Sequence, residues 1–533
     1  MSICASACLP LRTCAAVLVL ALSTGATARS AIVVGPGGDL QAAINGATGG
    51  DVITLTAGVT YTGNFLLPTH GGSGVVTIRT KPDDRLPAPG QRVSPQDAPR
   101  LARLQSGNSG PALQTAPGAR GWRLELLEFG PNAGGSGDII QLGDGSPAQA
   151  NLNQVPRDLA IDRCYIHGDR AVGQKRGIAL NSGATEITGS HIDEIKEIGF
   201  ESQAIAGWNG PGPFRIDNNH LEAAGEVFLL GGATPGIHDL VPSDVVFTRN
   251  YVGRPEAWLT EKWQVKNLFE LKNARRVMVS MNLFEHNWVA AQPGYAIVLT
   301  PRGEHGEAAW AVVEDVTFRL NIVRDVAAAI NVLGHDDAGP SGLARRVRIS
   351  ENLFYGFDRE KWKGNGFFLL INDGPPDITV ERNTILQAGN LIEAAGRQAG
   401  APVTIERFIF RDNIALHNAF GVHGQGRGVG KDTLNAYFPD VEFDHNVLAG
   451  ANPSAYPPAN FFPSAAALMA EFVAPEARDF RLKSGSKYLT AAADGGPIGA
   501  PMRELAQILE GSDTKQDDRS NNRSHPRGRG SGG

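Results

Sequence analysis

The chain has 533 residues and a formal net charge of −6, and only 20% of its residues are Lys, Arg, Asp or Glu. This charge gives no overall attraction to nucleic acid, so nucleic acid is not expected as a partner and an anionic ligand must meet a local basic patch. The 65 glycines and 33 prolines indicate many turns and short strands, and they argue against a fold of long charged helices.

The N-terminus has the pattern of a secretory signal peptide. Arg12 precedes the apolar run 15–22, and Ala26 and Ala28 form a small-residue cleavage site, so residues 1–28 are predicted to be removed. The run is shorter than the roughly 20 apolar residues that a membrane-spanning helix needs. We expect a monomer that is secreted or periplasmic/extracellular, has no integral membrane contact and keeps Cys164 as its single cysteine.

The first segment of the mature chain predicts a cap. Asp39 is a plausible N-cap for a short helix over 40–46, followed by strands within 51–67. Such a helix suits the end of a stacked core, which is otherwise open to solvent. Residues 81–100 are rich in proline and polar side chains, and they predict a surface loop.

A repeat begins near residue 155. Asparagine recurs at spacings of 31, 32, 39, 31, 31, 30 and 33, at Asn219, Asn250, Asn282, Asn321, Asn352, Asn383, Asn413 and Asn446. Cys164 and Ser190 occupy the same position in two earlier segments. A period near thirty with several short strands, and without helical 3.6 spacing, predicts an all-β parallel coil whose turns stack. Asparagine suits the corners because it tolerates the left-handed backbone and its side chains can bond along the stack.

Over residues 31–500 this repeat resembles the right-handed parallel β-helix proteins, a group that includes pectate-lyase-like enzymes. The resemblance implies one β-helix domain over 29–500, a single-stranded solenoid behind the N-terminal capping helix. Residues 478–500 look like a closing segment that ends the stack with a strand and a glycine-rich turn. Residues 501–533 predict a short helix over 501–510 and a disordered tail rich in Arg, Gly and Ser.

The stretch 263–306 contains three β-like runs, 267–272, 277–285 and 296–300. When the apolar strands of successive repeats are aligned, their following corners should lie above one another, about 4.8 Å apart per turn. The middle corners carry Glu270, Lys272, Arg302, Glu304, His305, His335, Asp336, Asp337, Asn372 and Asp373. Such a strip either binds a charged polymer or forms ion pairs among its own side chains, and the sequence leaves both interpretations open.

The composition of the strip suits elimination on a uronic-acid polysaccharide. A base must remove the proton beside the sugar carboxylate, and a cation must stabilise the charge that develops. Lys272, flanked by Arg275 and Arg276, is the candidate base because like charges favour a neutral amine. Arg302 would neutralise the carboxylate or protonate the leaving oxygen, and His335 is the third catalytic candidate.

The remaining residues of the strip are assigned to binding. Arg275, Arg276, His305, Asn372 and Asp373 are candidates for contacts to an acidic polysaccharide. Carboxylate oxygens are preferred ligands of Ca²⁺, so a calcium site is expected at Glu270, Asp336 and Asp337. Four tryptophans can offer faces to sugars or pack within loops: Trp258, Trp263, Trp288 and Trp310.

The run FELKNARRVMVSMNLFE followed by AIVLTPRG also resembles β-helix lyases of the chondroitinase B and alginate lyase type. That resemblance implies a catalytic lysine at Lys272 and a catalytic arginine at Arg302. In those lyases the arginine directly follows its strand in an L-x-L-R-H-G motif, whereas Thr300 and Pro301 intervene here.

The expected function is that of a secreted carbohydrate-active protein, a polysaccharide lyase acting by β-elimination. Two alternatives remain. One is a non-catalytic glycan-binding or surface/matrix β-helix protein. The other is a polygalacturonase-like glycoside hydrolase, which needs paired carboxylates such as Asp336, Asp337 and Asp373.

Overall fold

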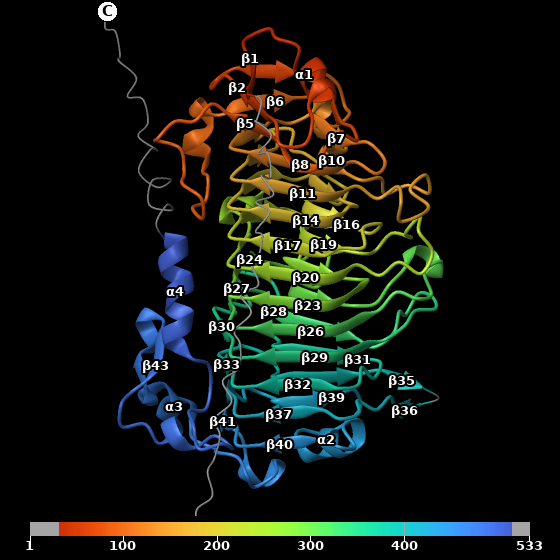
Figure 1. Cartoon of the computed structure of the whole chain (residues 1–533). Helices are drawn as coiled ribbons and strands as arrows, with labels where there is room; N and C mark the ends of the chain where they lie inside the picture. Colours follow the sequence, from red (N-terminus) through yellow and green to blue (C-terminus); the bar gives the residue numbers. More distant parts are fainter. Residues whose placement is uncertain (1–30, 399, 514–533) are drawn as a thin grey trace, which may run out of the picture.

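Each turn of the chain adds one strand to each of three parallel sheets, named A, B and C, which run the length of the molecule (Figure 1). The computed structural model describes residues 31–398 and 400–513. One passage through sheets A, B and C is called a coil below. The protein is a right-handed parallel β-helix, as the repeat predicted. The predicted signal peptide (1–28) and most of the predicted tail lie outside the described residues.

Sheet A has 14 strands. In stacking order they are β1 (Ala31–Val34), β2 (Val52–Leu55), β5 (Val76–Thr80), β8 (Arg120–Glu125), β11 (Arg157–Asp162), β14 (Gly183–Thr188), β17 (Phe214–Asp217), β20 (Ser243–Thr248), β23 (Ala274–Ser280), β26 (Val313–Arg319), β29 (Ala344–Ser350), β32 (Ile378–Glu381), β37 (Ile409–Arg411) and β40 (Glu442–Asp444).

Sheet B has 13 strands. They are β3 (Thr60–Thr62), β6 (Ala102–Gln105), β9 (Leu127–Phe129), β12 (Tyr165–His167), β15 (His191–Ile195), β18 (His220–Ala223), β21 (Tyr251–Gly253), β24 (Leu283–Asn287), β27 (Ile322–Val326), β30 (Leu353–Tyr355), β33 (Thr384–Ile385), β38 (Ile414–Leu416) and β41 (Val447–Ala449).

Sheet C has 12 strands. They are β4 (Phe65–Leu67), β7 (Leu113–Thr115), β10 (Asp138–Leu142), β13 (Arg176–Leu180), β16 (Gln203–Gly207), β19 (Glu226–Leu230), β22 (Phe269–Leu271), β25 (Tyr295–Leu299), β28 (Ala328–Leu333), β31 (Leu369–Asn372), β34 (Ile392–Ala395) and β39 (Val422–Gly424).

Other elements are short. The α-helices are α1 (Leu40–Gly46), α2 (Lys431–Tyr437), α3 (Ala465–Glu471) and α4 (Met502–Asp513). The 3₁₀ turns are η1 (Pro95–Arg100), η2 (Ala133–Gly135), η3 (Glu256–Thr260), η4 (Glu304–Gly306), η5 (Pro453–Ala455), η6 (Pro475–Ala477) and η7 (Lys487–Thr490). Two antiparallel pairs complete the structure: β35 (Arg397–Gln398) with β36 (Ala401–Pro402), and β42 (Phe472–Ala474) with β43 (Asp479–Leu482). No helix among the described residues is long and apolar enough to cross a membrane.

The core is built from side chains that repeat in register from coil to coil. In sheet C, Phe228 is paired with Phe269, which is paired with Ile297. All three are buried, and apolar burial of this kind is the main favourable term in folding. Each strand therefore contributes one inward residue at the same height, and the chain cannot slip by one residue without turning that row outward.

The predicted asparagine corners form a continuous ladder between sheets A and B. Asn321 shows the pattern: its side-chain amide donates to the Oδ1 of Asn352 at 3.1 Å and to the carbonyl of Val279 at 3.0 Å, and its own Oδ1 accepts from Asn282 at 2.9 Å. Asn460 continues the ladder beyond Asn446, and Ser190 begins it. The corner asparagines are thus structural, as predicted, and they bond along the stack. The expectation that they adopt the left-handed backbone is wrong, because the positive φ lies one residue earlier, for example at Leu320 and Glu351.

A second ladder, which the repeat pattern did not reveal, lies where the strands of sheet A begin. Non-glycine residues with positive φ recur there, and from β20 onward they alternate in charge: Asp244, Arg276, Asp315, Arg346, Asp377 and Arg407. Three ion pairs join neighbours in this series, Arg276–Asp244 at 2.7 Å, Arg346–Asp315 at 2.6 Å and Arg407–Asp377 at 2.5 Å. The alternation places opposite charges directly over one another.

The N-terminal segment contains the predicted helix and the predicted surface loop. Helix α1 has the predicted bounds, and Asp39 caps it by accepting from the Ala42 amide at 2.9 Å. Residues 81–100 form no strand, as predicted, but they are more than a loose loop, because Leu86 and Val93 pack with Leu101 and Leu126.

The C-terminal segment differs from its prediction. Its strand β43 pairs with β42 in a separate sheet and does not extend the stack. Together with α3 and α4 it folds back over the outer face of sheet B (Figure 1). There it covers an apolar row that includes Leu283, Ile322 and Leu353. Helix α4 runs three residues beyond the predicted end of a short helix at 510.

Candidate functional site

The predicted corner exists at the C-terminal edge of sheet C. The amide of Arg302 donates to the carbonyl of Lys272 at 2.8 Å, so the two residues lie on adjacent coils. The Lys272 side chain is 15% exposed and that of Arg302 is 35% exposed. The periodicity of the sequence therefore placed this pair correctly.

Arg302 is held by two carboxylates from the next coil. Its Nε donates to Asp336 Oδ1 at 2.7 Å, and its other nitrogen pairs with Asp337. Asp373 lies close to Asp337 and His335; burial, then the charge of Asp337, raises the pKa of Asp373, and the charge of His335 opposes this. The structure thus brings Arg302, His335, Asp336, Asp337 and Asp373 together.

Lys272 contacts an acid. Its Nζ lies 3.4 Å from Glu270 Oε1, and Glu270 Oε2 accepts from the side-chain amide of Asn267 at 3.0 Å. Glu270 is only 2% exposed, so it cannot present an open oxygen pair to solvent. Glu270 thus acts as an anchor for Lys272.

The preceding coil contributes a charged group that sequence reasoning missed. Glu226 is fully buried, accepts from Gln203 at 3.0 Å and lies 3.2 Å from the Nζ of Lys266, which also pairs with Glu201. Burial, followed by the charges of Glu270 and Glu201, raises the pKa of Glu226. A buried carboxyl beside Lys266 and Glu270 is the kind of perturbed acid that concentrates at functional sites.

Arg254 supports this region from the turns between sheets B and C. It is fully buried and donates to the carbonyls of Ala223 at 3.0 Å, Gly225 at 3.1 Å and Asn267 at 3.0 Å. Desolvation lowers its pKa to about 9. One side chain thereby ties the segments that carry Glu226 and Lys272 to each other.

Two predicted binding residues lie elsewhere. Arg275 and Arg276 belong to β23 of sheet A, beyond the corner that follows Lys272. Arg275 donates to the Ser243 hydroxyl at 3.2 Å and Arg276 pairs with Asp244, so the proposed effect of like charges on Lys272 is not supported. His305 lies in η4 with its side chain 83% exposed, and Asn372 ends β31.

The tryptophans pack within loops. Trp258 and Trp288 are 4% and 3% exposed and share an apolar cluster with Trp362, against which Trp263 packs. The indole of Trp310 donates to the carbonyl of Leu240 at 3.1 Å. Trp258 and Trp288 therefore offer no free face for sugar stacking, whereas Trp263 and Trp310 are partly exposed.

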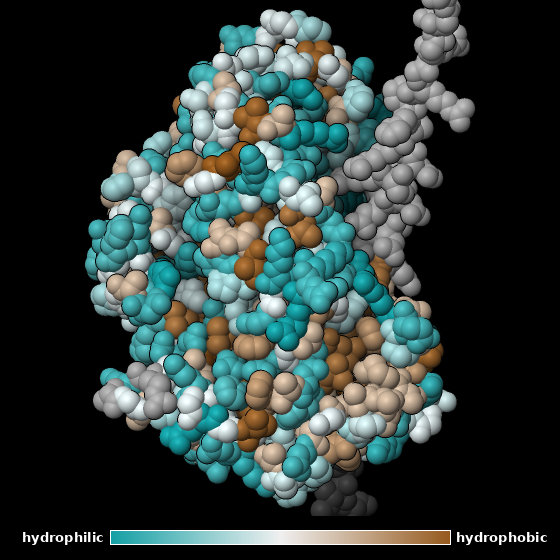
Figure 2. All heavy atoms as spheres, turned by 180° about the vertical axis from the view of Figure 1, so that it is seen from behind, coloured by the Kyte–Doolittle hydropathy of each residue, from teal (hydrophilic) through white to brown (hydrophobic). Residues whose placement is uncertain are grey.

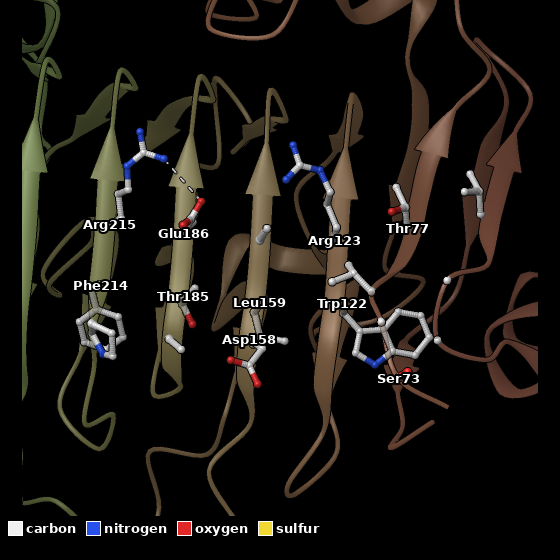
Figure 3. A pocket seen from close by; sticks show the side chains of 18 of the residues that line it. Ser73, Thr77, Trp122, Arg123, Asp158, Leu159, Thr185, Glu186, Phe214 and Arg215 are labelled. Atoms are coloured by element: carbon white, nitrogen blue, oxygen red, sulfur yellow. Dashed lines mark hydrogen bonds and ion pairs between the residues drawn. The ribbon is translucent and has the colours of Figure 1, made fainter. Parts of the chain in front are cut away.

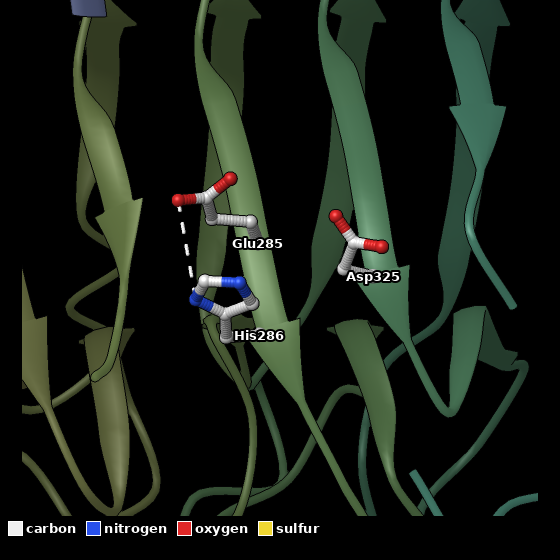
Figure 4. A group of neighbouring side chains, drawn as sticks. All are labelled: Glu285, His286 and Asp325. Carbon is white, nitrogen blue, oxygen red and sulfur yellow. Dashed lines mark ion pairs between the residues drawn. The ribbon is translucent and has the colours of Figure 1, made fainter. Parts of the chain in front are cut away.

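The calcium assignment finds limited support. Among the described residues, one group of three or more potential ligands comes together, and it consists of Glu285, His286 and Asp325 on sheet B (Figure 4). The ligand atoms lie within 4.8 Å of one another, yet Arg324 donates to Glu285 at 2.6 Å and Arg478 to Asp325 at 3.1 Å. Glu270, Asp336 and Asp337 do not form such a group, and arginine already holds both aspartates, so these residues do not fit a resident Ca²⁺.

The face of the molecule opposite to sheet A is largely hydrophilic, with small hydrophobic groups scattered over it (Figure 2). The largest hydrophobic area in that view lies at the lower right, on the side of the C-terminal segment. A surface of this kind suits a polar ligand, since large contiguous apolar patches mark protein or membrane contacts.

Comparison with known proteins identifies the architecture. The sequence matches no family profile and no curated protein. Among solved structures, a mannuronic acid specific polysaccharide family 6 lyase from human gut microbiota superposes with a TM-score of 0.52 at 12% identity, covering 91% of this chain and 99% of that one. The family 6 alginate lyase AlyGC has a TM-score of 0.49 at 14% identity over 82% of this chain and 53% of its own length. Pectate lyase Pel9A has a TM-score of 0.36 at 12% identity, covering 88% and 95% of the two chains. By its three long parallel sheets, and in agreement with the likeness to the family 6 lyase at a TM-score of 0.52, this chain is a right-handed parallel β-helix protein.

Proposed function

We propose that the protein is a carbohydrate-active β-helix enzyme that cleaves a uronic-acid-containing polysaccharide by β-elimination at the edge of sheet C. The main support is the main-chain hydrogen bond between Arg302 and Lys272, which sets a lysine and an arginine on adjacent coils, about 4.8 Å apart. The fold is shared with a mannuronic acid specific lyase, and this likeness agrees with the proposal without carrying it.

In the proposed reaction Lys272 takes the proton from the sugar carbon beside the carboxylate. The electron pair left behind forms the carbon–carbon double bond, and the bond to the glycosidic oxygen breaks. Lys272 acts as the base in its neutral form, and Glu270, 3.4 Å away, positions its Nζ.

Arg302 is proposed to neutralise the substrate carboxylate. Its pairing with Asp336 and Asp337 fixes the guanidinium, and the Asp337 side chain, 68% exposed, is the partner that a substrate carboxylate can displace. A positioned cation aimed at the developing charge is worth about 3 kcal/mol in comparable sites. His335, exposed beside Asp373, is proposed to donate the proton that the leaving glycosidic oxygen takes up as its bond to carbon breaks.

The test uses the purified protein with alginate, polygalacturonate and chondroitin sulfate. Cleavage by elimination creates an unsaturated uronate that absorbs in the ultraviolet, whereas hydrolysis does not. Replacement Lys272→Ala should lower kcat by at least about 100-fold, as expected for loss of a general base. Arg407→Ala serves as the matched control, because Arg407 is an exposed cation on sheet A paired with Asp377. Equal activity of the Lys272→Ala and Arg407→Ala variants would remove Lys272 from the mechanism.

The ion pairs of Arg302 also favour a second candidate, a non-catalytic glycan-binding protein. The Arg302 guanidinium is already paired with two carboxylates, so it has charge partners without any substrate. Under this alternative the same polysaccharides bind without forming unsaturated products, and Lys272→Ala leaves the affinity unchanged.

A further inference from the structure

A second surface feature lies on sheet A, away from the Lys272 corner. It is an open trough of about 930 Å³ that crosses strands β2, β5, β8, β11, β14, β17 and β20 (Figure 3). Six steps of about 4.8 Å between adjacent strands make it about 29 Å long, parallel to the axis of the β-helix. Its volume falls at the upper end of the usual range for ligand sites, about 300–1,000 Å³.

Small side chains create the trough. One outward row of sheet A reads Thr77, Arg123, Ala160, Glu186, Arg215 and Val246 in paired register. Farther along the stack the same row continues with the longer Met278 and Arg348 on either side of Thr317. Ala160 in this row, with Ala184 in the row beside it, leaves the floor low between two arginines.

The backbone does not require alanine at one of these positions. Ala184 has φ of +44°, at a strand-start position that the neighbouring coils fill with Gly121, Asp158, Pro213 and Asp244. Alanine gains no local hydrogen bond in the left-handed region, where Asn, Asp or Gly is the usual choice. A residue kept small at a backbone cost points to a need for space, and strain of this kind clusters at functional sites.

The rim of the trough is polar and fixed. Arg123 donates to Asp162 at 2.6 Å, and Arg215 donates to Asp217 at 2.6 Å and reaches Glu186 at 3.5 Å. Figure 3 shows Arg123 and Arg215 on the same side of the trough, with Asp158 opposite. The charged residues that line the trough are two arginines and three carboxylates: Arg123, Arg215, Asp158, Glu186 and Asp244.

We propose that this trough is a saccharide-binding site separate from the sheet C corner, and that it takes a linear, uncharged sugar chain lying along the helix axis. Alanine and valine side chains suit the apolar faces of sugar rings, and paired arginines and carboxylates suit their hydroxyl groups on both edges. The excess of carboxylates disfavours phosphate backbones, which need basic surfaces. The length of the trough accommodates several sugar rings in a row.

The experiment measures binding of cellohexaose, xylohexaose and maltohexaose to the full mature protein by isothermal titration calorimetry. Ala160→Trp places a large ring on the floor and should weaken binding at least ten-fold. Ala184→Asn, which suits the left-handed backbone but lengthens the side chain, should weaken binding while raising the thermal unfolding temperature. Thr317→Trp is the matched control, because Thr317 lies in the same outward row outside the trough.

The two sites give independent readouts. Ala160→Trp should leave cleavage of a short soluble uronate substrate unchanged, and Lys272→Ala should leave hexasaccharide binding unchanged, so failure of one proposal does not affect the other. Failure of all three neutral hexasaccharides to bind would overturn the trough proposal. Binding that survives Ala160→Trp, or that Thr317→Trp weakens equally, would overturn it as well.

Discussion

Arg276 pairs with Asp244 one coil away on sheet A, with 2.7 Å between Nε and Oδ1, although it stands only four residues after Lys272 in sequence. The chain turns the corner from sheet C to sheet A between these two residues. The charge of Arg276 is therefore used in the alternating ladder, and it is not available to Lys272.

A double-mutant cycle on this pair should give a small coupling energy. Arg276→Ala, Asp244→Ala and the double variant are compared by urea unfolding, and both side chains are about half exposed. We expect a coupling of about 0.2–1 kcal/mol that shrinks at high salt, because water and ions screen exposed pairs. A coupling above this range, or one insensitive to salt, would show that the ladder contributes more than surface pairs do.

Substitution in the asparagine ladder should be costly. Asn321→Ala removes hydrogen bonds to Asn352, Val279 and Asn282 in a buried corner, and the backbone amide of Asn282 also loses its acceptor. We expect a loss of about 2–4 kcal/mol in the free energy of unfolding. Asn365→Ala is the control, since Asn365 lies outside the ladder and its side-chain amide donates to Tyr295 Oη at 3.2 Å. The ladder would be dispensable if the two variants unfold at the same urea concentration.

Arg254 should resist conservative replacement. Lysine has no planar fork with which to reach the carbonyls of Ala223, Gly225 and Asn267 together. Arg254→Lys should therefore cost about 2 kcal/mol, and Arg254→Met about 3 kcal/mol or more, because buried carbonyls lose their donors. Differential scanning calorimetry gives both values. An unchanged melting temperature for Arg254→Lys would contradict the view that the planar guanidinium is needed to hold these three carbonyls.

Glu226 should make folding depend on pH. Its pKa is raised in the folded protein, mainly by burial, above the unfolded value of about 4.3. The unfolded chain then releases its proton first, so stability falls as pH rises from the unfolded pKa through the folded one. Glu226→Gln removes this loss, and its stability relative to the unsubstituted protein should increase between pH 4 and pH 8. The increase should be about 1.4 kcal/mol for every pH unit that separates the folded pKa from the unfolded pKa.

The control is Asn365→Ala, which removes a side chain that carries no titratable group. Its stability difference should stay flat over the same pH range. A flat difference for Glu226→Gln would mean that Lys266 and Gln203 compensate fully for the burial of the carboxylate.

Local turn chemistry and periodicity accounted for much of the fold. The bounds of α1 followed from Asp39 as N-cap, and the corners followed from asparagines that recur every thirty-odd residues. The same periodicity placed Lys272 and Arg302 on adjacent coils. These features depend on residues near in sequence or on a regular spacing, and both are visible without coordinates.

The features that were not predicted lie where the spacing between successive strands is irregular. Strand β16 was missed because its sequence, QAIAG, carries a weak β pattern and lies only 27 and 23 residues from its paired positions in β13 and β19. Glu226 begins the next strand, β19, and it escaped notice because the polar strip was sought at the corners that follow the strands of sheet C. The positions of Arg275 and Arg276 could not be predicted either, since the number of residues in the corner after β22 decides which face they occupy.

The last fifty residues of the described chain cover strands that come much earlier in the sequence. Because α4 and β43 lie over strands such as β24 and β30, the outer face of sheet B stays uncovered until these C-terminal elements have been synthesised. A truncation before α3 would expose Leu283, Ile322 and Leu353 as a continuous apolar row on the outer face of sheet B. A contiguous exposed apolar row of this kind favours aggregation, so the C-terminal segment covers the surface of sheet B and adds no coil to the stack.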